Sequence, residues 1–151
     1  MLHIALLEPE IPPNTGNIAR LCAATGAALH LIGRLGFRLD DRELRRAGLD
    51  FWPHIHLHRH ASLRDLESAL PEARILCFTA RGMVPYTRAA YRDGDCLLFG
   101  KESVGLPPEV LERIALRTFS IPMSTGKVRS LNLATAVGIV LYEALRQIEG
   151  W

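Results

Sequence analysis

One polar stretch between an apolar strand and an apolar helix has the composition of a ligand-binding corner. The strand ends at Ile121–Pro122, the small residues Ser124–Gly126 form a loop, and a helix is expected to begin within Arg129–Asn132. The first N–H groups of a helix lack partners within it and attract ligands. Ser130 is the expected N-cap, and the Asn132 amide, expected one turn inside, can donate and accept. An ordinary capped helix has the same pattern, so this stretch alone leaves both interpretations open.

Two further loops, Asn14–Arg20 and Gly100–Gly105, also carry polar and glycine residues after an apolar strand. In an open parallel sheet such loops gather beyond the carboxyl ends of the strands, where ligands bind. Gly100 permits the close approach of a ligand or simply a tight turn, and Glu102 beside Lys101 serves a site or forms a solvated pair. The motifs G-x-G-x-x-G and G-x-x-x-x-G-K-[ST] do not occur, which argues against Rossmann dehydrogenases, Rossmann-type methyltransferases and P-loop NTPases.

The elements that position these loops begin with a β-α-β unit. Asn14 or Thr15 is the expected helix cap and Gly26 the stop signal. Three prolines within residues 8–16 predict a stiff, irregular loop before the helix. The unit therefore comprises the strand Leu2–Leu7, the helix Gly16–Thr25 and the strand Ala28–Ile32.

The rest of the chain continues the alternation of strands and helices. Ser62 with Asp65 has the form of a capping box, and Pro107–Pro108 suits the first turn of a helix. At 151 residues the chain predicts one α/β domain, residues 1–151, with a mainly parallel sheet of five or six strands flanked by helices. The further elements expected are the helix Asp41–Ala47, the extended segment Ile55–Leu57, the helix Ser62–Leu70, the strands Arg74–Thr79 and Cys96–Phe99, and a helix ending at Ile114.

The C-terminal helix is apolar on most of its sides. One stripe follows helical spacing, and a second apolar side adjoins it. A helix of this kind is either buried within the monomer or part of a dimer interface, and the dimer is the favoured interpretation. The stripe is Ala134, Val137, Gly138, Leu141, Ala144, Leu145 and Ile148, and the second side is Leu133, Ala136 and Val140.

Composition narrows the function classes only weakly. The net charge is +2, but 16 of the 18 cations are arginine, which suits bidentate phosphate contacts and also follows from a GC-rich genome. Cys22, Cys77 and Cys96 are far apart in apolar contexts and predict reduced core thiols. No charged segment followed by an apolar one precedes the first strand, and no apolar run is long enough to cross a membrane, so the cytoplasm is the expected location.

Four histidines alternate along one segment, at positions His54, His56, His58 and His60. They suit either a zinc site or the polar side of a half-buried strand, and no metal is expected.

The three loops together resemble the three motifs of the SPOUT-superfamily RNA 2′-O-ribose methyltransferases. Within this superfamily the chain is most similar to the small bacterial enzymes that methylate the wobble ribose of leucine tRNAs. The motif segments are Asn14–Arg20, Leu98–Leu106 and Ile121–Leu133, and the closer likeness rests on Pro9–Gly26, Leu44–Asp50 and Tyr91–Gly100.

The resemblance implies a C-terminal trefoil knot over about residues 75–151, S-adenosylmethionine as the cofactor and a homodimer as the active unit. Core packing remains an alternative role for Phe78 and Ile121. By family position the cofactor-binding residues are Phe78, Thr79, Gly100, Ile121, Met123, Ser130 and Leu131, and the catalytic residues are Asn14, Arg20, Glu102 and Asn132.

The resemblance also implies RNA contacts. Arg20 is expected at the target nucleotide, where its permanent charge suits phosphate binding and field stabilisation better than proton abstraction. Arg42, Arg45 and Arg46 share a helix face that grips tRNA or is merely solvated, and Tyr142 either reaches the RNA or lies in the core.

The sequence therefore predicts a methyltransferase acting on the anticodon stem-loop of leucine tRNAs, at cytidine or modified uridine 34. The alternatives are another RNA site or a non-catalytic RNA-binding protein of the same fold. The presence of the residues expected to act in catalysis argues against the non-catalytic alternative.

Overall fold

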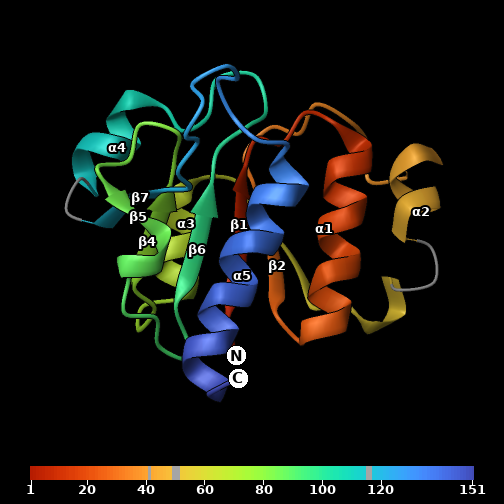
Figure 1. Ribbon diagram of the computed structural model, residues 1–151. Helices are drawn as coiled ribbons and strands as arrows, with labels where there is room; N and C mark the ends of the chain where they lie inside the picture. Colours follow the sequence, from red (N-terminus) through yellow and green to blue (C-terminus); the bar gives the residue numbers. More distant parts are fainter. Residues whose placement is uncertain (41, 49–51, 115–116) are drawn as a thin grey trace.

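The computed structural model describes residues 1–40, 42–48, 52–114 and 117–151 (Figure 1). Asp41, Leu49 and Asp50, which the sequence places in a helix or motif, lie outside these residues. In chain order the elements are β1 (His3–Leu7), α1 (Pro12–Thr25), β2 (Ala28–Ile32), α2 (Arg42–Gly48), η1 (Trp52–His54), β3 (Leu57–His60), α3 (Leu63–Ala69), β4 (Ile75–Phe78), β5 (Val84–Pro85), η2 (Tyr86–Arg88), β6 (Cys96–Phe99), α4 (Pro108–Arg113), β7 (Thr118–Ser120) and α5 (Leu133–Glu149).

The strands form one sheet in the order β3-β2-β1-β6-β4-β7-β5, and every pair of neighbours is parallel. The predicted parallel α/β architecture is confirmed. The expected count of five or six strands is wrong, because the residues described by the structure already form a sheet of seven. The missed strand is β5, which has only two residues at the sheet edge and gives no periodic signal.

Helices cover both faces of the sheet (Figure 1). On one face α1 and α5 lie side by side, and Ile18, Val137 and Leu141 are fully buried there. On the other face α3 and α4 pack against the sheet through Leu66 and Val110. Burial raises the pKa of Cys22, Cys77 and Cys96 to about 12, which confirms that they are core thiols.

The start of α1 corrects the predicted irregular loop. The helix begins at Pro12, four residues before the expected Gly16, and the backbone of Ile11 is its N-cap without a side-chain bond. Pro12 and Pro13 occupy the first turn, where a helix makes no use of their missing N–H groups. The predicted end is confirmed, because Gly26 adopts a left-handed φ of 79°.

The cap of α5 differs from the prediction by two residues. Asn132 is the N-cap, and its side-chain oxygen accepts from the Thr135 N–H at 3.2 Å. Ser130, the expected cap, lies exposed in the preceding loop. Along α5, Val137, Val140 and the rest of its inner side are buried, whereas Ala134, Gly138 and Leu145 are only partly buried and Tyr142 is exposed. No helix within the described ranges combines the length and apolar character that crossing a membrane needs.

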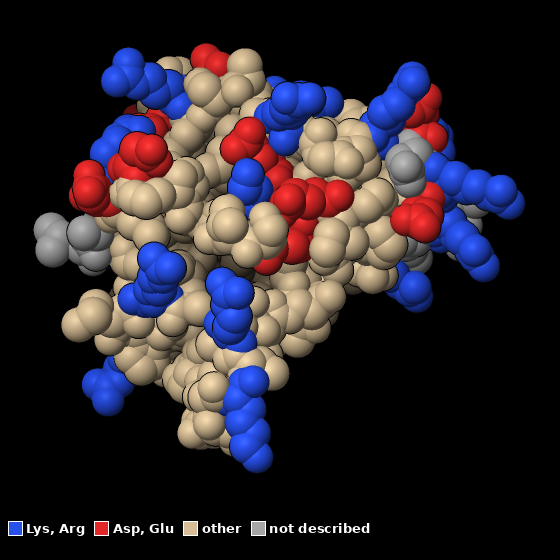
Figure 2. Space-filling model, turned by 90° about the horizontal axis from the view of Figure 1, so that it is seen from above, with Lys and Arg blue, Asp and Glu red and all other residues tan. Residues whose placement is uncertain are grey.

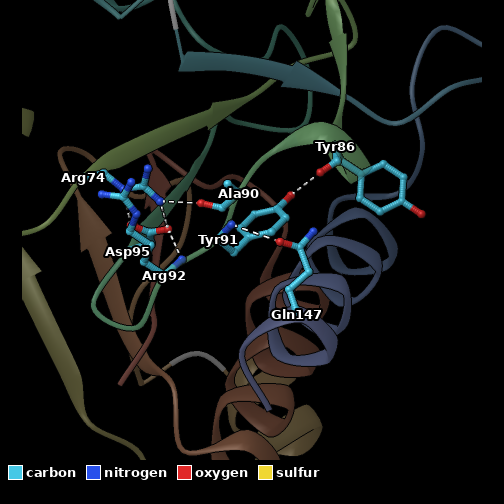
Figure 3. Close-up of polar contacts among 7 residues, drawn as sticks. All are labelled: Arg74, Tyr86, Ala90, Tyr91, Arg92, Asp95 and Gln147. Atoms are coloured by element: carbon cyan, nitrogen blue, oxygen red, sulfur yellow. Dashed lines mark hydrogen bonds and ion pairs between the residues drawn. The ribbon is translucent and has the colours of Figure 1, made fainter. Parts of the chain in front are cut away.

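A polar network joins the β5–β6 connection to the rest of the fold (Figure 3). Both Arg74 guanidinium contacts to the nearly buried Asp95 carboxylate are short, at 2.8 and 2.7 Å. The Tyr91 N–H donates to the Gln147 side chain on α5 at 3.1 Å, and the Tyr91 hydroxyl donates to the Tyr86 carbonyl at 2.7 Å. The β5–β6 connection is therefore bonded through Asp95 to the start of β4 and through Tyr91 to α5.

The four alternating histidines do not share one strand. His54 ends η1 and His56 precedes β3, so His58 and His60 are the two that lie on β3. They stand beside His30 on β2 and His3 on β1. His3 Nδ1 and His30 Nε2 lie 3.0 Å apart, and His30 Nδ1 and His60 Nε2 lie 2.9 Å apart. Among the described residues no three histidine, cysteine or acidic side chains are grouped as metal ligands.

This histidine cluster predicts acid-sensitive folding. His30 is 2% exposed, and burial with the neighbouring histidines lowers the pKa of His30 from 6.5 to about 3. Burial also lowers the pKa of His3 and His60. The unfolded chain therefore takes up protons near pH 6.5 while the folded chain does not, and stability present above that pH is lost as the pH falls towards 3. From His30 alone, denaturant unfolding at pH 5 should give a free energy about 2 kcal/mol below that at pH 7.5.

The charged groups nearest the cluster do not reverse this sign. The chain amino terminus lowers the pKa of His3 further, while Asp93 opposes that shift, and Asp65 opposes the shift of His60. A His30→Gln variant should flatten the pH dependence. Equal unfolding free energies of the original chain at the two pH values would contradict the prediction.

Candidate active site

The three predicted loops meet at one edge of the sheet, where β4, β6 and β7 end side by side. The last residues of β4 and β6, Phe78 and Phe99, stack with ring centroids 5.1 Å apart, and Phe119 of β7 lies 5.9 Å from Phe78. Phe78 is 6% exposed, so it packs in the core, as the alternative interpretation of this residue expected. These three rings form an apolar floor under the loops.

The loop after β6 closes tightly on itself. Lys101 and Gly105 form an antiparallel bridge, with the Gly105 N–H donating to the Lys101 carbonyl at 2.8 Å. A Cβ at Gly100 would lie 2.0 Å from the Gly105 carbonyl carbon and 2.2 Å from the Leu106 nitrogen. The loop itself therefore requires glycine at position 100.

Glu102 is bound to the chain that leads into α1. Its Oε2 accepts from the backbone N–H groups of Glu10 at 2.7 Å and Ile11 at 3.0 Å. In return the Ser103 N–H donates to the Glu10 carboxylate at 2.9 Å, and bonding to Ser103 lowers the pKa of Glu10. We name this reciprocal contact of Glu10, Ile11, Glu102 and Ser103 the clasp. The second Glu102 oxygen, Oε1, is buried and has no hydrogen-bond partner among the described residues.

Asn14 and Asn132 connect the first and third loops. The Asn132 amide donates to the Asn14 side-chain oxygen at 3.0 Å across 118 positions of sequence. Because Asn132 also caps α5, this bond fixes the starts of α1 and α5 relative to each other. The structure thus brings together Asn14, Asn132 and, through the clasp, Glu102.

Arg20 is not part of this group. It lies six residues beyond Asn14 on α1, about 9 Å along the axis and turned well away from it. Asn14 is buried and Arg20 is exposed. Within a single chain, Arg20 is therefore separated from the other three predicted catalytic residues.

The predicted cofactor residues surround the aromatic floor. Ile121, Met123 and Leu131 are only partly buried, so their apolar surfaces remain accessible, and Ser130 is exposed. The Thr79 N–H is taken by the Phe119 carbonyl at 3.0 Å. Apolar side chains beside backbone polar groups suit a flat, uncharged adenine, so the residues fit S-adenosylmethionine.

The predicted RNA contacts lie at the surface. Arg42, Arg45 and Arg46 are exposed on α2, and cations gather on that side of the carboxyl edge (Figure 2). Tyr142 is 45% exposed, so the core alternative for it is wrong, and its ring contacts Trp151 with centroids 6.1 Å apart.

Sequence reasoning missed Glu10 and Ser103. Glu10 lies in the proline-rich segment, where the only usable signal was an acidic side chain directly before a helix start. Its partner lies 93 positions away, and no local pattern encodes that pairing.

Comparisons with known proteins agree with this geometry. Residues 1–142 match the model of the SpoU rRNA Methylase family. The tRNA (cytidine(34)-2′-O)-methyltransferase of Escherichia coli (strain K12) is 47% identical over 149 residues, covering 98% of this chain and 94% of that protein.

Solved structures give the same result. One described as giving structural insights into the 2-OH methylation of C/U34 on tRNA is 55% identical, with a TM-score of 0.95 over 100% of this chain and 98% of that one. The AdoMet-bound rRNA methyltransferase from Sinorhizobium meliloti is 32% identical, with a TM-score of 0.85 over 96% of this chain and 56% of that one. The resemblance inferred from the three loops is confirmed, and the chain belongs to the SpoU methylase family of RNA methyltransferases.

Proposed function

We propose that the protein transfers a methyl group from S-adenosylmethionine to the ribose 2′-hydroxyl of the wobble nucleotide of leucine tRNAs. The wobble nucleotide is cytidine or 5-carboxymethylaminomethyluridine at position 34. The observation that carries the proposal is near full-length similarity to tRNA (cytidine(34)-2′-O)-methyltransferases, with the three motif loops joined at one strand edge. The anticodon stem-loop is the part of the tRNA that must reach this edge.

The cofactor residues proposed are Phe78, Thr79, Gly100, Ile121, Met123, Ser130 and Leu131. When bound, S-adenosylmethionine supplies an activated methyl group, so the chain's own residues chiefly align the acceptor ribose. Asn14, Asn132 and Glu102 hold the loops in register, and Arg20 binds the phosphate of the target nucleotide and stabilises developing charge. Arg42, Arg45, Arg46 and Tyr142 bind the surrounding RNA.

We further propose that about residues 75–151 form a trefoil knot. In support, β7 lies between β4 and β5 although it follows both in sequence. The β5–β6 connection must therefore cross β7, and Tyr91 in that connection is bonded to Gln147 of α5 (Figure 3). Because α5 follows β7 in sequence, the chain after β7 passes beside the earlier β5–β6 connection, and a threaded chain requires such an arrangement.

A homodimer is the proposed active unit. The outer side of α5 is apolar and only partly buried at Ala134, Gly138 and Leu145. The separation of Arg20 from Asn14 supports a site completed by a second copy. At a cofactor concentration too low to load the Ser130→Leu variant, mixing Arg20→Ala and Ser130→Leu subunits should then give more activity than either variant alone, since one hybrid site is intact. No restoration would place Arg20 and the cofactor in the same subunit.

The test of the proposed function is transfer of labelled methyl from S-adenosylmethionine to unmodified and cell-extracted tRNA pools, followed by mapping of the labelled nucleotide. Label on the wobble ribose of leucine tRNAs supports the proposal. Label elsewhere moves the substrate to another RNA site. No label together with no cofactor binding would favour a non-catalytic RNA-binding protein.

The Ser130→Leu variant tests the cofactor loop. Ser130 is exposed beside the partly buried Leu131, so a leucine there does not disturb the core. It removes a hydroxyl and crowds the proposed cradle, and the dissociation constant for S-adenosylmethionine should rise by about 10-fold or more. Calorimetric titration measures it, with Ser124→Leu in the same loop as the control. An unchanged constant would place the cofactor elsewhere.

A further inference from the structure

A hollow of about 510 Å³ lies between the Gly100–Gly105 loop and α4, at the carboxyl edge of the sheet. The hollow is bordered by the loop that begins at Gly100, but the residues that line it include none of the proposed cofactor residues. The charged residues that line it are Glu8, Arg81, Lys101 and Glu112. The volume is sufficient for a nucleoside. The floor is apolar and includes Leu7, Leu106, Pro107 and Leu111.

Glu8 is held at this hollow in an unusual backbone conformation. Its φ is 52°, the only positive value of a non-glycine residue among the described residues, and side chains disfavour that region. The Glu8 N–H donates to the Ile32 carbonyl at 2.8 Å. Gly33 makes room for the side chain, since a Cβ there would lie 2.9 Å from the Glu8 Cγ. The ends of β1 and β2 therefore hold the Glu8 side chain in its position.

The carboxylate has no partner within the described chain. Neither Glu8 nor Arg81 forms a side-chain hydrogen bond or an ion pair with any residue in residues 1–40, 42–48, 52–114 and 117–151. Glu10 and Glu102 on the neighbouring loops differ, because both are engaged in the clasp. A strained acidic residue without an internal partner, beside an open apolar hollow, points to an external hydrogen-bond donor.

We infer that the hollow binds the nucleobase of the nucleotide to be methylated, with the Glu8 carboxylate accepting a hydrogen bond from an exocyclic amino group. This rests on the proposed function. A flipped base stacks on the apolar floor, and Arg81 and Lys101 bind the adjoining phosphates. Carboxylates pair with the amino group of cytosine, whereas unmodified uracil presents a carbonyl oxygen there and is repelled; the charged amine on C5 of 5-carboxymethylaminomethyluridine supplies a donor that unmodified uracil lacks. Glu8 thus favours cytidine over unmodified uridine.

The experiment compares two anticodon stem-loop RNAs that differ only by C or U at the wobble position. The ratio of kcat/KM for C over U should fall by about 10-fold in Glu8→Gln, because the glutamine amide serves both bases. Glu109→Gln removes a charge from α4 outside the hollow and should leave the ratio unchanged. An unchanged ratio in Glu8→Gln overturns the inference. So does a weaker affinity for S-adenosylmethionine, which would make the hollow part of the cofactor site.

Two further measurements separate this inference from the proposed function. If the original chain methylates neither these RNAs nor the cell-extracted tRNA pool, the proposed function fails, and fluorescence anisotropy with the same RNAs still tests the hollow. Binding should be tighter to the C RNA, and Glu8→Gln should abolish the difference; equal binding by the original chain overturns the inference. Glu8→Gly relieves the positive φ, so the melting temperature should rise by about 2–4 °C while C-over-U preference is lost. Retained preference in that variant also overturns it.

Discussion

Replacing Arg20 with alanine is expected to lower the rate of methyl transfer by about 1,000-fold, the size of effect seen when a group that stabilises developing charge is removed. Arg20 is exposed on α1 and lies outside the buried core, and a contact of an exposed side chain adds little to stability. The melting temperature should therefore stay within about 2 °C of the original. The dissociation constant for S-adenosylmethionine should also be unchanged, because Arg20 lies outside the proposed cradle.

Two variants sharpen this result. Arg20→Lys keeps the charge but loses the bidentate fork, so it should recover part of the activity. Arg64→Ala removes an exposed arginine on α3, on the opposite face of the sheet, and should be fully active. Weak cofactor binding by Arg20→Ala would move this residue into the cradle, and full activity would remove it from the site.

Local patterns were sufficient for most of the fold. The stop at Gly26 and the N-cap at Ser62 were correct because a left-handed glycine and a short side-chain bond act within a few residues. The parallel sheet followed from apolar strands alternating with helices. The error at the start of α1 arose because Pro12 and Pro13 were assigned to a loop although proline suits the first turn of a helix. The error at α5 arose because Ser130 and Asn132 can both cap a helix.

The site was less predictable because long-range contacts create it. Nothing near Asn14 indicates that Asn132 will donate to it, and nothing near Glu10 indicates Ser103. The resemblance supplied the residues that matter, but not their physical roles. Glu102 illustrates the difference, since it is expected in catalysis and is found binding two backbone N–H groups.

The role of Glu102 leads to a second large effect. Glu102→Ala leaves the N–H groups of Glu10 and Ile11 without their charged acceptor, and stability should fall by about 2 kcal/mol. The loosened start of α1 carries Asn14, so the Asn14–Asn132 bond loses its position. A misplacement of about 1 Å near a reacting centre costs about 100-fold, and the rate of methyl transfer should fall by that amount.

Glu102→Gln decides between positioning and chemistry. The glutamine oxygen still accepts from both N–H groups, so stability should lie within about 1 kcal/mol of the original and most activity should return. Denaturant unfolding and single-turnover methyl transfer measure the two quantities, with Glu109→Ala as the control for loss of an exposed carboxylate. If Glu102→Gln is as stable as the original chain but as inactive as Glu102→Ala, the negative charge acts in the reaction itself. If its activity follows its stability, Glu102 acts through the clasp, by holding Asn14 in place.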